Sequence, residues 1–223
     1  CKDADLERAA QWIVDSRIGN NGQICNNAER VYVQKEVKAE FTKILVEKMK
    51  AVKVGDPCKD ESVDMGPLVE QRALESVTEK VERAIKQGAK LLCGGQRVGT
   101  KGYFYAATVL DDCRQDMDII HEETFGPVIP LVEFDTIDQV IAWANDCEYG
   151  LASSIFTKDL NIATKACREL EFGETYINRE HFEVMQGFHA GVKKSGIGGA
   201  DGKHGVEEYL VTHVTYLDTY EDM

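Results

Sequence analysis

The sequence predicts a three-layer α/β domain, in which a mainly parallel sheet lies between two layers of helices. Segments rich in β-branched and aromatic residues alternate along the chain with segments whose apolar residues recur at helical spacing. Strands that alternate with helices of roughly 10 to 15 residues form crossover units, and such units build parallel sheets. The 223 residues are also 43% hydrophobic and 29% charged, which is typical of a globular domain with a core.

The first predicted elements are a helix and a strand. Either Asp3 or Asp5 can cap the first turn of the helix. Its apolar residues recur at helical spacing, namely Leu6, Ala9, Ala10 and Ile13. Residues 29–34 then alternate between polar side chains and β-branched or aromatic ones, which predicts a strand.

Two more helices and three more strands are expected next. One helix has an apolar face formed by Val37, Phe41, Ile44, Leu45 and Val52, and the turn at residues 55–57 ends it. The apolar face of the other consists of Leu74, Val77, Val81, Ala84 and Ile85, with Gly88 as its C-terminal cap. We expect strands over residues 90–93, 103–110 and 128–134.

The same alternation continues in the second half of the chain. Thr136 and Gln139 open a capping-box pattern, so we expect a helix from there to about Asn145. Strands are expected over 152–157 and 174–178, with a helix over 161–170 between them. We expect Asn178 to hold a turn.

The end of the chain has a different composition. Residues 187–205 contain seven glycines, which predicts a loop without regular structure in which the backbone approaches another group closely. Residues 209–217 then alternate apolar and polar side chains and predict a terminal strand with one exposed face. Such a strand is free to pair with a neighbouring chain, so we expect a homo-oligomer.

Charge and cysteine content exclude several classes of protein. Lys and Arg total 26 against 39 Asp and Glu, and this net charge of -13 argues against a nucleic-acid partner. No apolar run is long enough to cross a membrane. The seven cysteines include no Cys-x-x-Cys pair, so we expect no metal site and a reducing, cytoplasmic location.

The chain begins without Met and leads into a helix pattern, which we interpret as a cut from a longer protein.

Two polar segments are candidates for chemistry. Cys25 lies in the loop Asn20-Asn21-Gly22-Gln23-Ile24-Cys25, between a predicted helix and a predicted strand. A thiol there is either a nucleophile, with backbone N–H groups beside it to stabilise an oxyanion, or a bystander. Residues 121–127 begin His-Glu but lack the second His of a zinc motif, so we reject a metal there. From spacing alone this segment remains open between a solvated acidic turn and a functional loop.

The two segments together resemble a known family. Gly22-Gln23-Ile24-Cys25 is similar to the active-site signature of the aldehyde dehydrogenase superfamily, and Glu122-Glu123-Thr124-Phe125-Gly126-Pro127 is similar to its Glu-Glu-x-Phe-Gly-Pro cofactor motif. The resemblance extends over essentially the whole chain. It implies a catalytic domain over residues 1–205 and an oligomerisation strand and tail over 206–223. Residues 177–191 and 194–205 are in turn similar to the bacterial subgroup that oxidises lactaldehyde and glycolaldehyde with NAD.

The resemblance implies a role for each matching residue. Cys25 is implied to be the nucleophile that forms a thiohemiacetal and then a thioester with a small aldehyde substrate. Glu123 is implied to bind the ribose of the NAD cofactor, and Phe125 to pack beside its nicotinamide. The polar pocket for a hydroxyaldehyde is implied to contain Asn26, Glu183 and His189.

Parts of the family's active site are not found in this sequence. No Glu-Leu-Gly-Gly type motif, which carries the general base in the family, precedes Cys25, and the Rossmann-like cofactor domain is missing. We therefore expect the isolated chain to bind NAD weakly and to have little or no turnover. Two interpretations follow: the catalytic domain of an aldehyde dehydrogenase, or a non-catalytic oligomerising module derived from one.

Overall fold

The computed structural model describes residues 1–218 and has a four-stranded main sheet. Its strand order is β1 (Val31–Gln34), β4 (Val128–Phe134), β3 (Thr108–Cys113) and β2 (Lys90–Cys93). The central strand β4 pairs in parallel with both of its neighbours, and only the edge strand β2 runs antiparallel to its partner. The predicted mainly parallel sheet is therefore confirmed.

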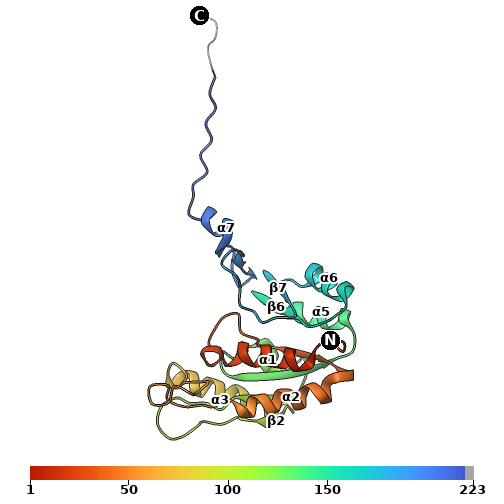
Figure 1. Ribbon diagram of the computed structural model, residues 1–223, viewed down its shortest axis with the longest axis vertical. Coiled ribbons are helices and arrows are strands. Elements are labelled where there is room, and N and C mark those ends of the chain that lie inside the picture. The colour runs from red at the N-terminus through yellow and green to blue at the C-terminus, as the bar shows by residue number, and fades with distance from the viewer. Residues whose placement is uncertain (219–223) are drawn as a thin grey trace, which may run out of the picture.

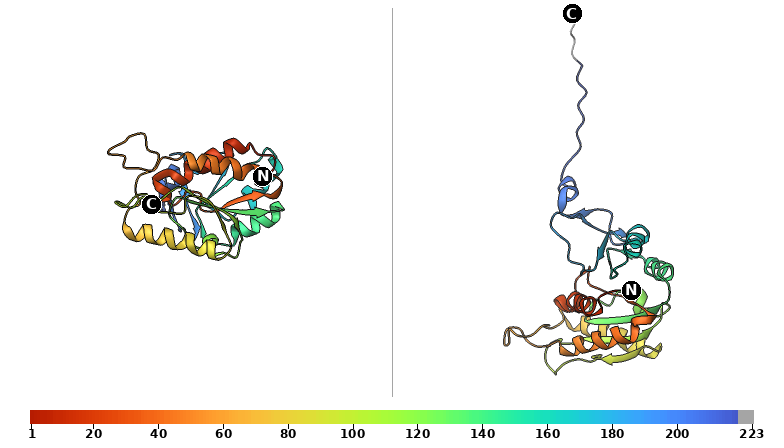
Figure 2. Two further views of the ribbon diagram at one scale, coloured as in Figure 1. Left: turned by 90° about the horizontal axis from the view of Figure 1, so that it is seen from below. Right: turned by 45° about the vertical axis from the view of Figure 1, so that its right-hand side comes forward.

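Helices cover both faces of this sheet, which gives the three layers (Figures 1 and 2). The helices α1 (Leu6–Ile18) and α2 (Lys38–Ala51) pack on one face, against Val109, Ile129 and Leu131. The opposite face carries α3 (Gln71–Lys86) and the short α4 (Asp118–His121), which pack on Leu110, Val128 and Val132. Neighbouring residues of one strand thus belong to different cores, because successive side chains of a strand point to opposite faces.

A second, smaller parallel pair of strands lies beside the main sheet (Figure 1). It consists of β6 (Ala152–Ile155) and β7 (Glu174–Ile177). Two helices belong to this part, α5 (Ile137–Asn145) and α6 (Leu160–Glu169), and α6 packs against both α5 and β7. No helix among residues 1–218 is both long and apolar enough to cross a membrane.

Local signals position the ends of several elements as expected. The Asp5 side chain caps α1 by accepting the N–H of Arg8, whereas Asp3 accepts from Thr157, Lys158 and Asp159 in the second part of the chain. Thr136 caps α5 by accepting the N–H of Gln139. Gly88 follows α3 with φ +109°.

The strand expected over residues 103–110 is shifted. The strand β3 begins at Thr108 and continues to Cys113, because residues 103–107 pair with residues 96–98. Tyr105 forms an isolated antiparallel bridge with Arg97, and the N–H of Val98 donates to the carbonyl of Phe104. These hydrogen bonds connect residues 103–107 to residues 96–98 instead of to the main sheet.

The glycine-rich segment is more ordered than predicted. It contains β8 (His189–Ala190), β9 (Val192–Lys193) and β10 (Gly199–Ala200), and the helix α7 (Gly202–Glu207) begins within it. Two antiparallel pairings account for the strands: β8 pairs with β10, and β9 pairs with β5 (Tyr149–Gly150). Close backbone approach is confirmed at Gly199 of this segment, where a Cβ atom would lie 2.4 Å from the carbonyl oxygen of His189.

The terminal strand expected over 209–217 forms no ladder with another strand of residues 1–218. This segment runs away from the rest of the molecule (Figure 1). Its apolar side chains are exposed, namely Tyr209, Leu210, Val211, Val214, Tyr216 and Leu217. A strand requires a partner, and within the described chain this segment has none. The expected boundary after residue 205 falls inside α7 and stays a prediction.

Candidate active site

The two predicted functional loops meet at a backbone contact. Gly22 has φ +75°, and a Cβ atom on it would lie 2.2 Å from the carbonyl oxygen of Gly126. Only glycine combines this left-handed backbone with an approach so close. The structure therefore joins the Cys25 loop to the loop at residues 122–127, although about a hundred residues separate them.

Cys25 lies at the exposed tip of a turn. The N–H of Asn27 donates to the carbonyl of Ile24 at 3.1 Å across this turn, and the thiol of Cys25 is free. Among residues 1–218 the N–H of Cys25 has no hydrogen-bond acceptor. The turn follows the short 3-10 helix η1 (Gly19–Gly22), in which Asn20 and Asn21 both have left-handed φ values. Asparagine tolerates this conformation, which explains the pair of asparagines.

Two of the three predicted substrate residues lie together. Asn26 is buried, and its Nδ2 donates to Oε2 of Glu183 at 3.1 Å and to the carbonyl of His181 at 2.8 Å. The Nδ1–H of His181 donates in return to the carbonyl of Asn26 at 2.6 Å. Burial lowers the pKa of His181 below its ordinary value, so the neutral ring is favoured. These hydrogen bonds connect Asn26, the residue after Cys25, to the segment that follows β7.

His189 belongs to an adjacent cluster and makes no hydrogen bond to Asn26 or Glu183. Its Nδ1 lies 3.1 Å from Oε1 of Glu174. The other oxygen of Glu174 accepts from the hydroxyl of Tyr176 at 2.8 Å, and the ring of Tyr176 lies 5.9 Å from that of His181. Burial and then the hydrogen bond to Glu174 raise the pKa of Tyr176. His189 thus reaches the Asn26 pair only through intermediate side chains.

A buried ion pair holds the loop that carries Glu123 and Phe125. Arg17, at the end of α1, is fully buried and lies 2.9 Å from Oε1 of Glu29. The carboxylate of Glu29 also accepts the backbone N–H groups of Thr124 at 3.2 Å and Phe125 at 3.0 Å. Phe125 has φ +50°, an unusual conformation for a bulky residue, and these hydrogen bonds hold it there.

The side chains of Glu123 and Phe125 are both exposed on this loop. Partial burial of the carboxyl group raises the pKa of Glu123, and the neighbouring Glu29 carboxylate raises it further. Lys80 of α3 donates to the backbone carbonyl of Glu123 and anchors the loop from the other side. An exposed carboxylate beside an exposed aromatic ring fits the ribose and nicotinamide of a dinucleotide, since the carboxylate can accept two hydroxyl hydrogen bonds.

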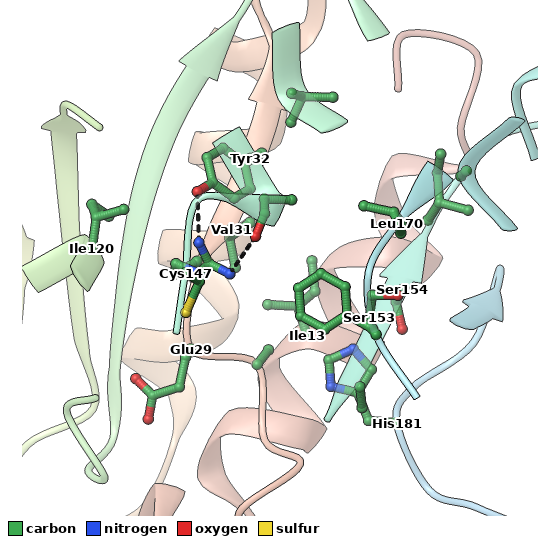
Figure 3. Close-up of a pocket in the computed structure, with 18 of the residues that line it drawn as sticks. Ile13, Glu29, Val31, Tyr32, Ile120, Cys147, Ser153, Ser154, Leu170 and His181 are labelled. Atoms are coloured by element: carbon green, nitrogen blue, oxygen red, sulfur yellow. Dashed lines mark hydrogen bonds between the residues drawn. The ribbon is translucent and has the colours of Figure 1, made fainter. Parts of the chain in front are cut away.

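A cavity of about 490 Å³ lies beside the Cys25 loop and the loop at residues 122–127. Cys25, Asn26, Glu123 and His181 line it, but most of its lining is apolar and comes from helices and strands. Figure 3 shows Glu29 and His181 at one end, with Val31 and Tyr32 on one side of the cavity and Ser153 and Ser154 on the other. Among residues 1–218 no three His, Cys, Asp or Glu side chains are grouped so as to hold a metal ion.

Three residues of this site have no signal in the sequence. His181 comes shortly after a predicted strand and belongs to no motif with a characteristic spacing. Glu29 is one polar position in an alternating strand pattern. Arg17 occupies a helix end where a cation is ordinary. Asn178, by contrast, holds a turn as expected: it has φ +55° and exchanges two hydrogen bonds with the backbone of Thr157.

Comparison with known proteins adds three findings. Lactaldehyde dehydrogenase from Escherichia coli (strain K12) is 58% identical over 217 residues, which are 97% of this chain and 45% of that protein. The crystal structure of lactaldehyde dehydrogenase from Escherichia coli matches with a TM-score of 0.95 over 97% of this chain and 46% of that one. Betaine aldehyde dehydrogenase from Staphylococcus aureus, in complex with NAD+, is 35% identical and matches with a TM-score of 0.88 over 94% and 42% of the two chains. The chain spans about half the length of the curated relatives it matches.

A family model also matches this chain. The family model described as the aldehyde dehydrogenase family matches residues 1–215, which include both candidate loops and the segment between them. Sequence identity and fold agree over the same residues. The chain belongs to the aldehyde dehydrogenase family.

Proposed function

We propose that this chain is the catalytic part of an NAD-dependent aldehyde dehydrogenase that oxidises short hydroxyaldehydes, such as lactaldehyde and glycolaldehyde, to carboxylic acids. The observation that carries the proposal is the backbone contact between Gly22 and Gly126. It brings the loop with an exposed thiol to the loop with an exposed carboxylate and aromatic ring. A nucleophile and a dinucleotide-binding surface are the two parts that this reaction needs side by side.

Cys25 is the nucleophile in this proposal. Its thiolate attacks the aldehyde carbon, forming a C–S bond and a thiohemiacetal whose oxyanion the free N–H of Cys25 stabilises. NAD supplies the hydride acceptor when it is bound. Loss of the hydride leaves a thioester on Cys25, and water then cleaves the C–S bond, which releases the carboxylic acid and regenerates the thiol.

Glu123 and Phe125 form the cofactor surface. The Glu123 carboxylate accepts hydrogen bonds from ribose hydroxyls, and the Phe125 ring packs beside the nicotinamide. Glu29 keeps both residues in position, because it binds the loop through the N–H groups of Thr124 and Phe125.

Asn26, Glu183 and His189 provide polarity for a substrate that carries a hydroxyl group. A hydroxyl in an apolar pocket would lose its hydrogen bonds to water without replacement, so polar side chains favour a hydroxyaldehyde over an alkyl aldehyde. The 58% identity to a lactaldehyde dehydrogenase supports the same substrate class.

The chain spans about half the length of the curated relatives it matches, so the activity is proposed for a whole protein of that length. No Glu-Leu-Gly-Gly type motif precedes Cys25 to supply a general base. We therefore propose that the isolated chain turns over little or not at all. All seven cysteines are free thiols, which supports a reducing, cytoplasmic location.

The test is NADH formation from lactaldehyde by the full-length protein. We expect Cys25→Ser to abolish it and Cys167→Ser, a matched change at another exposed thiol, to leave it unchanged. Turnover by the Cys25→Ser protein would refute the nucleophile. Robust turnover by the isolated 223-residue chain would refute its proposed inactivity.

The second candidate function is a non-catalytic oligomerising module, which the exposed apolar side chains of residues 209–217 favour. An aldehyde-like electrophile separates the two. Selective labelling of Cys25 over Cys58 and Cys167, which are also exposed, supports the enzyme, whereas equal labelling of the three supports the module.

A further inference from the structure

The turn that carries Cys25 depends on contacts from outside the turn. The N–H of Asn27 donates to the carbonyl of Ile24 at 3.1 Å, so Cys25 and Asn26 are the two central residues of this turn. A single hydrogen bond restrains an exposed turn only weakly, because water competes for the same groups. The position of the Cys25 thiol is therefore set by whatever holds Asn26.

Three hydrogen bonds hold Asn26, and all of them come from residues 181–183. Two use the Asn26 side chain, whose Nδ2 donates to the carbonyl of His181 at 2.8 Å and to Oε2 of Glu183 at 3.1 Å. The third joins Nδ1 of the His181 ring to the backbone carbonyl of Asn26 at 2.6 Å. The His181 ring is thus the group of this segment that binds the backbone of the turn.

The ring of His181 is fixed in one tautomer by its surroundings. A backbone carbonyl only accepts, so the ring nitrogen that faces Asn26 carries the hydrogen. Burial lowers the pKa of His181, which favours the neutral ring and leaves its second nitrogen, Nε2, without a hydrogen. The ring of Tyr176 lies 5.9 Å away, centroid to centroid. These contacts define both the orientation and the donor of the ring.

The segment that presents His181 is itself attached to the paired strands β6 and β7. Asn178 exchanges two hydrogen bonds with the backbone of Thr157, directly after β7. The hydroxyl of Ser154, in β6, donates to the carbonyl of Arg179 at 3.1 Å. His181 therefore extends from a supported backbone toward the turn, as a positioning group requires.

We propose that His181 is a positioning residue for the nucleophile: its Nδ1–H fixes the Asn26 carbonyl and thereby the placement of the Cys25 thiol and N–H. This role rests on the proposed function, in which Cys25 attacks the aldehyde. His181 acts through Asn26 and takes no part in bond formation. A misplaced nucleophile lowers the rate of attack and leaves cofactor binding intact, because Glu123 and Phe125 belong to another loop.

The test compares His181→Leu with His181→Asn in the full-length protein. The two side chains have nearly the same shape and leave the same gap, but only the Asn amide, whose nitrogen lies where Nδ1 of histidine lies, can donate to the Asn26 carbonyl. We expect His181→Leu to lower the single-turnover rate of NADH formation from lactaldehyde by about tenfold or more, and His181→Asn to stay within about threefold of the wild type. The KM for NAD should be unchanged in both.

Amide hydrogen exchange at Asn27 gives a second readout that does not need turnover. This N–H closes the turn, so a looser turn releases it for exchange more often. We expect His181→Leu to speed its exchange by about tenfold and His181→Asn to change it little. If the His181→Leu protein does not fold, His181→Gln takes its place, because its amide lies one bond further from the backbone.

Slower turnover together with faster Asn27 exchange in His181→Leu, both restored in His181→Asn, supports the proposal. Equal effects of the two variants overturn it, because the ring would then serve packing alone. Wild-type behaviour of His181→Leu, or slower turnover without faster exchange, overturns it as well. A wild-type protein that forms no NADH would refute the proposed function instead, and the exchange measurement would still decide whether His181 holds the turn.

Discussion

Oε1 of Glu29 lies 2.9 Å from Nη1 of Arg17, a guanidinium with no solvent exposure, while the same carboxylate holds the backbone of Thr124 and Phe125. The Nε and Nη2 atoms of Arg17 have no hydrogen-bond partner among residues 1–218. The buried cation therefore depends heavily on Glu29. One ion pair at the junction of α1 and β1 consequently stabilises the core and positions the proposed cofactor loop.

Glu29→Ala should lower the free energy of unfolding by about 3 kcal/mol. Removing one partner of a buried pair costs about 3 to 5 kcal/mol, because it leaves an uncompensated charge, and Glu29 itself is partly exposed. The measurement is chemical denaturation of the isolated chain. Glu36→Ala is the control, since Glu36 pairs with Lys2 on the surface and its loss should hardly move the midpoint. Equal midpoints for the two variants would show that Glu29 does not compensate Arg17.

Gly22→Ala should destabilise the chain by about 3 kcal/mol, through a left-handed backbone and a clash with Gly126. Gly99→Ala isolates the backbone contribution, because Gly99 has φ +71° with no atom within 4 Å of an added Cβ. We expect Gly99→Ala to cost only about 1 kcal/mol. Thermal or chemical unfolding measures both changes, and similar losses would mean that the two loops do not touch.

Cys113 should resist alkylation until the chain unfolds. Burial raises the pKa of its thiol to about 12, so the reactive thiolate is scarce at pH 8. Cys25 and Cys58 are exposed and should react in the native state. Mass spectrometry of peptides after timed iodoacetamide treatment gives each rate. Native-state labelling of Cys113 at the rate of Cys58 would be incompatible with this core.

His181 should make the chain less stable as the pH falls below about 6.5. Its pKa is lowered in the folded state, so the unfolded state binds the proton first and acid favours unfolding. Stability from this group is fully present above the unfolded pKa and is lost as the pH falls through the folded pKa. His181→Gln should flatten the dependence of unfolding free energy on pH between 7 and 5, whereas His213→Gln, at an exposed position, should keep it. Identical slopes for the two variants would contradict this role.

Deleting residues 209–223 should abolish association of the chain. The exposed apolar side chains of residues 209–217 have no partner within the described chain, and a neighbouring chain can cover them. Light scattering over a wide range of concentration measures the assembly. A full chain that stays monomeric throughout, or a truncated chain that associates equally well, would contradict the prediction.

The sequence predicted those elements whose signals are local. The bounds of β2 and β4 agree with expectation, α1 and α5 begin at a predicted cap, and α3 ends near one, because capping and apolar periodicity act within one or two turns. The predicted start of strand β3 was wrong, because residues 103–107 begin with three aromatic residues, as a strand can, but bond to residues 96–98. For the site, spacing left Cys25 open between nucleophile and bystander, and resemblance to a family identified the two loops.

The sequence alone thus determined the order of most helices and strands before residue 178, the fold class and the two loops that carry the candidate chemistry. Only the tertiary structure decided which distant groups meet: the backbone of Asn26 with the His181 ring across 155 positions, the backbone N–H of Phe125 with the Glu29 carboxylate across 96, and His189 with Glu174 instead of Asn26. The physical reason is the separation along the chain of the residues that interact. Helical periodicity and capping depend on neighbours along the chain, whereas a hydrogen bond between distant residues depends on how entire layers pack. For the segment at 209–217 neither the sequence pattern nor the structure gives a pairing, because a strand edge needs a partner that residues 1–218 of one copy do not supply.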